Sequence, residues 1–162
     1  MMTSIFIIGI GIVMWVLFGY SLSFAPSGNA FIGDFRWLGL EGVSLTEGYT
    51  DDASIPNMVF SAFQMMFAVI TPALITGAVA GRMKFKSIFV FTIFWSLIVY
   101  YPLAHMVWGQ GGLLGADGIG ALDFAGGDVV HISSGVSALV LCILLGKRHD
   151  YEHSIYRIHN IP

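Results

Sequence analysis

The stretch ALDFAGGDVVHISSG, residues 121–135, sets two carboxylates and a histidine at the start of an apolar helix. The residues that follow, VSALVLCILL (136–145), carry no charge. An ionisable side chain on a membrane helix is costly, and by default it marks a pathway or a site. The rest of the chain is therefore expected to supply membrane-spanning helices, a cavity or a partner for His131.

The composition is typical of an integral membrane protein. Of its 162 residues, 56% are hydrophobic and 10% are charged, whereas a typical soluble domain carries about 25% charged residues. The net charge of -3 is small, and we expect no nucleic-acid partner. The single cysteine, Cys142, excludes an internal disulfide and lies in a hydrophobic run, which is typical of a small core residue.

Four apolar runs are long enough to cross a hydrocarbon core, which takes about 20 residues. We expect helices at about residues 5–24, 58–80, 87–105 and 129–146. They must be helical, because lipid offers no hydrogen-bond partners and four runs cannot close a barrel. Pro72 and Pro102 fall inside the second and third runs, and each predicts a kink or a discontinuity. The predicted fold class is an all-α integral membrane protein with four transmembrane helices.

The basic residues predict the orientation. Six of the seven Lys and Arg residues lie in the 82–86 turn or in the tail 147–162, and Arg36 is the exception. The positive-inside rule places both segments in the cytoplasm. The acidic 25–56 segment and the glycine-rich 109–127 segment are then extracellular loops. The chain would begin inside the cell directly with a helix, which suggests that a preceding helix is missing.

The fourth run has a small, partly polar face. Residues at helical spacing along it are Asp128, His131, Ser134, Gly135, Ala138 and Cys142. Small residues let another helix approach closely. His131 is either a pathway residue or a histidine hydrogen-bonded within the bundle. Asp123 is a candidate helix cap and looks more structural than catalytic, whereas Asp128 is either a local hydrogen-bond partner or solvated.

Aromatic residues gather on the second run and at the end of the third. Phe60, Phe63 and Phe67 are spaced three and four apart, so they share one side; this pattern suits packing or a site. Trp108 is either an interfacial tryptophan or a surface for cation–π contact. His105 has no ligand partners at metal-binding spacing, and we interpret it as a packing or hydrogen-bonding residue.

An enzymatic function is not expected. Ser133 and Ser134 follow His131, but no G-x-S-x-G elbow is present. Serines in such helices usually donate to the carbonyl four residues earlier. Neither a cofactor nor a metal is indicated.

Several ordered stretches together resemble the ammonium transporter family, Amt/Mep/Rh. They are WVLFGYSLSF (15–24), FQMMFAVITPALITGAVAGRMKF (63–85), YPLAHMVWGQGGLL (101–114), and ALDFAGGDVVHISSG followed by LGKR (145–148). The resemblance implies a fold of about eleven helices in two inverted halves with a pore between them, assembled as a homotrimer in the cell membrane. This chain would supply the second to fifth helices, a partial first half. The closing HNIP (159–162) resembles the lead into the sixth helix, so we expect a fragment.

The resemblance also implies roles for single residues. Trp108 resembles the outer recruitment tryptophan, Phe67 would complete that site, and Phe63 with Phe67 would form the gate below it. His131 resembles the first of two pore histidines, which relay the proton, and its partner would lie in the second half. Asp123 resembles the aspartate that orders backbone near the outer site. At Gly81 the chain departs from relatives that often carry Glu.

The implied function is ammonium transport across the membrane. The outer aromatic site would recruit the cation, which would lose a proton near the gate and pass as the neutral amine along the histidine pair. Some relatives are regulated by PII-type proteins at their cytoplasmic face. The alternative is a non-transporting ammonium sensor or an inactive truncated membrane subunit.

Overall fold

A computed structural model describes residues 2–26, 28–116, 118–148 and 151 of this chain. Four of its helical spans are long and apolar enough to cross a membrane, which confirms the predicted all-α fold class. Their bounds are Thr3–Phe24, Asn57–Val79, Phe85–Trp108 and Gly127–Leu145. The third span extends three residues beyond its predicted end at residue 105, so Trp108 belongs to the helix itself.

Three of the four spans contain a π-helical segment. The first consists of α1 (Met2–Met14), η1 (Trp15–Gly19) and α2 (Tyr20–Phe24); the third of α4 (Phe85–Trp95), η3 (Ser96–Tyr100) and α5 (Tyr101–Trp108); and the fourth of η4 (Gly127–Ile132) and α6 (Ser133–Leu145). A short 3₁₀ turn, η2 (Leu38–Leu40), lies in the long loop. Only α3 (Asn57–Val79) among these spans is α-helical throughout.

The two membrane prolines behave differently. Pro102 lies in the first turn of α5, directly after η3, so the predicted discontinuity in the third span is present there. Pro72 lies inside α3, which continues through it as one α-helix. One residue before Pro72, the Thr71 hydroxyl donates to the Phe67 carbonyl at 2.5 Å. A discontinuity is therefore found at one proline and not at the other.

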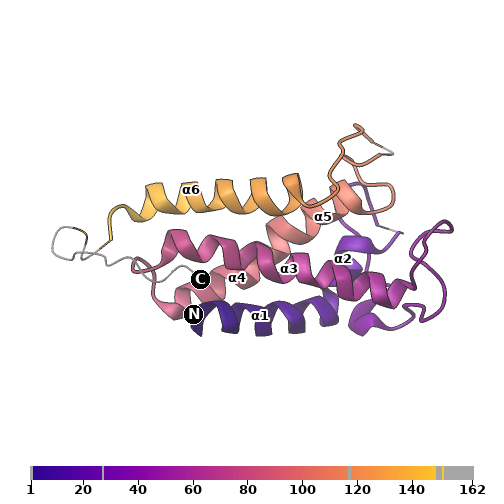
Figure 1. Cartoon of the computed structure of the whole chain (residues 1–162), viewed down its shortest axis with the longest axis horizontal. Coiled ribbons are helices and arrows are strands. Elements are labelled where there is room, and N and C mark those ends of the chain that lie inside the picture. The colour runs from indigo at the N-terminus through magenta and orange to yellow at the C-terminus, as the bar shows by residue number, and fades with distance from the viewer. Residues whose placement is uncertain (1, 27, 117, 149–150, 152–162) are drawn as a thin grey trace.

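The helices lie side by side along the long axis of the molecule, with α3 packed against both α1 and α6 (Figure 1). The connections 25–56 and 109–126 gather at one end. The turn between α3 and α4 and the end of α6 lie at the opposite end. Consecutive spans therefore run antiparallel.

Large aromatic side chains fill the core between the first and third spans. Trp15, Tyr20, Tyr100 and Tyr101 are each at most 1% exposed. Gly19 allows the closest approach, since a Cβ there would lie 2.8 Å from Cζ of Tyr101. The first span thus fixes the position of α5, whose last residue is Trp108.

Polar contacts tie the long loop 25–56 to residues at and just after the end of the third span. His105 is 1% exposed, and its Nδ1 and Nε2 lie 3.1 Å from the Ser23 carbonyl oxygen and 2.9 Å from that of Asn29. Gln110 donates from Nε2 to the Tyr49 carbonyl at 3.0 Å. His105 is therefore a buried hydrogen-bonding residue, as its sequence context indicated.

Candidate functional site

Two aromatic rings meet in the bundle, one from the middle of α3 and one from the last residue of α5. The Phe67 ring from α3 lies edge-on to the Trp108 ring from α5, with centroids 5.7 Å apart. Phe63 lies one turn away on α3, and its ring meets the Phe67 ring edge-on with centroids 5.1 Å apart. The Phe63 side chain is 54% exposed. The structure thus brings together three of the four aromatic residues that the sequence singled out, whereas Phe60 stacks on Tyr49 at 4.9 Å instead.

A hydrogen bond fixes the Trp108 ring. Its Nε1 donates to the Asp123 backbone carbonyl at 2.7 Å. The indole is therefore anchored by its edge to the segment that leads into η4. An anchored ring leaves its face free to meet Phe67 or a ligand in a set orientation.

The Asp123 carboxylate binds the start of the fourth span. Its Oδ1 accepts the N–H groups of Gly126 and Gly127 at 2.6 and 2.8 Å, and its Oδ2 those of Asp128 and Val129 at 2.9 and 3.0 Å. These are helix-terminal N–H groups that no backbone carbonyl satisfies. Burial alone would raise the pKa of Asp123, but the four N–H donors outweigh it and hold the pKa below its ordinary value.

Gly126 is a site residue that the sequence reasoning missed. Its φ of 87° is left-handed, a conformation that glycine adopts without strain. A Cβ there would lie 2.6 Å from Cγ2 of Val130 and 3.7 Å from Cη2 of Trp108. The glycine pair after Phe-Ala was the available signal, but it resembles any flexible loop.

His131 lies in η4, one turn into the fourth span. Its backbone N–H donates to the Gly126 carbonyl at 2.9 Å, five residues earlier, and its side chain is exposed. Within the described ranges its ring has no hydrogen-bond partner. The alternative of a histidine bonded within these helices is therefore not what the structure shows.

Asp128 is not a partner of His131 either. Its side chain lines an apolar cavity of about 510 Å³ between the third and fourth spans, beside Val99, Leu103 and Ile132. The small, partly polar face of the fourth span is only partly buried. Gly135 is exposed like His131, whereas Ser134 is buried.

The serines after His131 are bonded to their own helix. Ser133 donates to the Val129 carbonyl at 2.5 Å and Ser134 to the Val130 carbonyl at 2.6 Å. Each bond reaches back four residues, as predicted. A hydroxyl held in this way is no activated nucleophile, because no general base accepts its proton.

Exposed apolar side chains occur on all four spans, and the row on α3, together with the exposed residues of the neighbouring fourth span, is called the uncovered wall here. Along α3 the exposed side chains recur at helical spacing and are Val59, Phe63, Met66, Ile70 and Leu74, each between 45% and 59% exposed. The exposed His131 and Gly135 lie on the neighbouring fourth span. No cluster of three metal-ligating side chains occurs in the parts of the chain that the structure describes.

Comparison with known proteins gives a consistent result. The model of the Ammonium Transporter Family matches residues 1–162. An ammonium transporter of Bacillus subtilis is 56% identical over 138 residues, which are 85% of this chain and 33% of that protein. Ammonium transporter 1 of Dictyostelium discoideum is 47% identical, over 86% of this chain and 30% of that protein.

Solved structures of the same kind superpose on the four spans. The crystal structure of Mep2 from Candida albicans matches with a TM-score of 0.78 and 37% identity, over 90% of this chain and 31% of that one. Mep2 from Saccharomyces cerevisiae matches with a TM-score of 0.77 and 36% identity, over 89% and 32%. The chain therefore spans about one third of the length of the relatives it matches.

Proposed function

This chain belongs to the ammonium transporter family, and on that premise we propose that it supplies the outer site and one wall of a pathway that carries ammonium across the cell membrane. The family is one of transporters, not of enzymes. The contact between Phe67 and Trp108 carries the proposal, because it pairs two aromatic rings from separate helices next to the row of exposed apolar side chains on α3.

Recruitment of the cation is assigned to the outer aromatic pair. A cation that leaves water loses hydration energy, and an indole face returns about 2 kcal/mol when the cation is desolvated. The Trp108 ring is held by its bond to Asp123, whose carboxylate binds the start of η4. Asp123 therefore acts as a structural residue, and the pair is oriented before the ligand arrives.

The proposed gate shares Phe67 with this pair, and the proposed pathway continues to His131. Phe63 and Phe67 form an apolar constriction of the kind that excludes hydrated Na⁺ and K⁺. His131, exposed on the same wall of the bundle, is the proton-relay residue for ammonium that deprotonates at the gate. Histidine suits this task because its charge changes nearest to neutral pH.

The uncovered wall determines what the chain can do alone. The relatives are about three times longer, and we propose that their remaining length covers Phe63, Met66 and His131 and brings the second relay histidine. On this basis the whole protein is a homotrimer, with PII-type proteins as candidate regulators at the cytoplasmic face. The 162 residues by themselves are not expected to conduct.

A chimera tests the proposal directly. Residues of this chain would replace the matched third of the Bacillus subtilis relative, to which they are 56% identical. In cells without their own ammonium transporters, the chimera should restore saturable methylammonium uptake. Trp108→Leu should raise the half-saturating concentration about tenfold, because it removes most of the cation–π contribution. His131→Ala should abolish most of the uptake.

The controls separate transport from assembly. Leu144→Ala changes an exposed residue at the end of α6 that is far from His131, and uptake should remain near that of the parent chimera. Specific ammonium flux through the 162 residues alone in liposomes would contradict the proposed need for the remaining length. Unchanged uptake in both the Trp108 and His131 variants would contradict the proposed pathway.

A further inference from the structure

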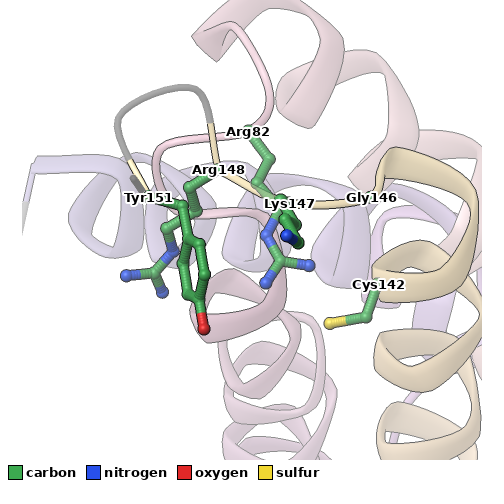
Figure 2. Close-up of a pocket in the computed structure, with 6 residues that line it drawn as sticks. All are labelled: Arg82, Cys142, Gly146, Lys147, Arg148 and Tyr151. Atoms are coloured by element: carbon green, nitrogen blue, oxygen red, sulfur yellow. The ribbon is translucent and has the colours of Figure 1, made fainter. Parts of the chain in front are cut away.

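Basic side chains line a cavity of about 500 Å³ at the end of the bundle opposite the aromatic site. Its lining residues are Arg82, Cys142, Gly146, Lys147, Arg148 and Tyr151 (Figure 2). They come from the turn after α3 and from the end of α6. None of them belongs to the outer site or to the uncovered wall.

Two glycines turn these segments toward the same space. Gly81 and Gly146 have φ values of 70° and 68°, a left-handed conformation that glycine accepts without strain. A Cβ at Gly81 would lie 3.6 Å from Cδ of Arg148, so the Arg148 stem packs across the turn that carries Arg82. Figure 2 shows both arginine side chains extending beside the Tyr151 ring, with Cys142 pointing toward them from α6.

Among the described residues, the charged side chains at this end are basic. Every carboxylate in the described ranges belongs to residues 34–52 or 123–128, at the other end of the bundle. Nε of Arg82 is buried and has no hydrogen-bond partner among the described residues. The Lys147 ammonium lies 5.4 Å from the centre of the Tyr151 ring. A buried guanidinium nitrogen without an acceptor is costly, and a bound anion would remove that cost.

We propose that this pocket binds a phosphate group, presented by an anionic phospholipid of the inner leaflet or by a soluble phosphate. Guanidinium groups offer planar pairs of N–H donors that match phosphate oxygens. Basic pockets between membrane helices on the cytoplasmic side bind anionic headgroups. The pocket lies where two membrane spans end, at the depth of a headgroup, and Cys142 and Gly146 form its weakly polar side. This site does not depend on transport.

Lipid binding to the 162-residue chain tests the proposal. Native mass spectrometry would count phosphatidylglycerol and phosphatidylcholine bound to the chain released from micelles. The double variant Arg82→Gln/Arg148→Gln should bind phosphatidylglycerol about tenfold more weakly, since each basic side chain near a headgroup contributes about a fivefold factor at most. Lys84→Gln/Lys86→Gln removes the same charge from the same turn outside the pocket, and it should weaken binding clearly less than the pocket variant does, because neither lysine lines the cavity.

A milder variant guards against a folding artefact. Arg82→Lys keeps the charge and removes the planar pair of donors, so it should weaken binding about threefold while leaving the helical circular dichroism unchanged. Equal loss in the pocket and control double variants would overturn the proposal. So would a parent chain that binds neither phosphatidylglycerol nor inorganic phosphate.

A second experiment distinguishes a lipid headgroup from a soluble phosphate as the source of the bound group. Inorganic phosphate is titrated into the chain in phosphatidylcholine nanodiscs and monitored by calorimetry. A preference for phosphatidylglycerol that survives excess phosphate assigns the site to a lipid. Phosphate binding that is lost in the pocket variant, without any lipid preference, assigns it to a soluble phosphate. Either result supports a phosphate site.

Discussion

At the scale of single residues, Asp123 connects the fourth span to the outer aromatic pair. Its carboxylate binds four N–H groups, and its carbonyl accepts the Trp108 indole N–H. One residue therefore orders both the start of η4 and the ring that is proposed to meet the cation. The sequence indicated a cap but not which N–H groups it would bind, because those depend on the turn made by Gly126.

Asp123→Asn should destabilise the chain by about 1 kcal/mol, as the loss of a helix-terminal acceptor usually does. The pKa of this carboxyl in the folded chain lies below its ordinary value of 3.8. Its stabilisation is therefore fully present above the unfolded-state pKa and is lost as pH falls through the folded-state pKa. Thermal unfolding followed by tryptophan fluorescence between about pH 6 and about pH 2 measures both effects.

The matched control for this experiment is Asp52→Asn, an exposed carboxyl in the long loop. It should leave the midpoint and its pH dependence near those of the parent chain. If Asp123→Asn retains the parent's loss of stability in acid, the four N–H bonds are not its cause.

Gly126→Ala should destabilise the chain by about 1–2 kcal/mol, the typical cost of a left-handed conformation for an L-residue. Its Cβ would also meet Val130 at 2.6 Å. Gly135→Ala is the control, because nothing lies within 4 Å of a Cβ there and alanine favours a helix. Unfolding midpoints in detergent compare the two. A midpoint for Gly126→Ala equal to that of Gly135→Ala would contradict the proposed role.

At the scale of elements, the outer loop and the third span are joined by His105. Its ring nitrogens lie beside the carbonyls of Ser23 and Asn29, which flank the first turn of the long loop. The sequence indicated a packing or hydrogen-bonding histidine, and its hydrogen-bond partners are 82 and 76 residues away. Local patterns carry no information about contacts at such separations.

His105→Phe should loosen the segment that follows α2. A phenyl ring has nearly the size of imidazole but offers no hydrogen bond to either carbonyl. Hydrogen exchange of residues 28–33 should become faster, while exchange in α3 should stay as in the parent. His131→Phe, a change at an exposed ring, should leave both segments unaffected. Unchanged protection of residues 28–33 would show that aromatic packing alone holds the loop.

The π-helical segments mark what the sequence could not predict about the elements. Trp15–Gly19 and Ser96–Tyr100 read WVLFG and SLIVY, and neither sequence carries a signal that separates a π-helix from an α-helix. Each widened turn lies where the first and third spans pack tightly, near the contact of Gly19 with Tyr101. Their cause is therefore tertiary, whereas the existence and approximate ends of the spans follow from local hydropathy.

At the scale of the whole molecule, the described basic and acidic residues gather mostly at opposite ends, with Arg36 beside Asp34 as the exception. The basic residues 82, 84, 86, 147 and 148 lie at one end, and the carboxylates of residues 34–52 and 123–128 lie at the other. This division was predictable from sequence, because four spans must return the chain to its starting side. The residues that are proposed to cover His131 could not be predicted, because they are not among these 162.

The orientation is the last prediction, and it follows from this division. Positive charge near membrane spans is retained in the cytoplasm, so the turn between α3 and α4 should face inside and the long loop outside. In a Cys142→Ser background, Ser54→Cys in the long loop and Ser87→Cys near that turn place one thiol at each end, both at exposed positions. A membrane-impermeant maleimide should label position 54 in intact cells and position 87 only after permeabilisation. The reverse pattern would contradict the orientation. Labelling of both from outside would mean that α3 does not cross the membrane, because a single span separates the two positions.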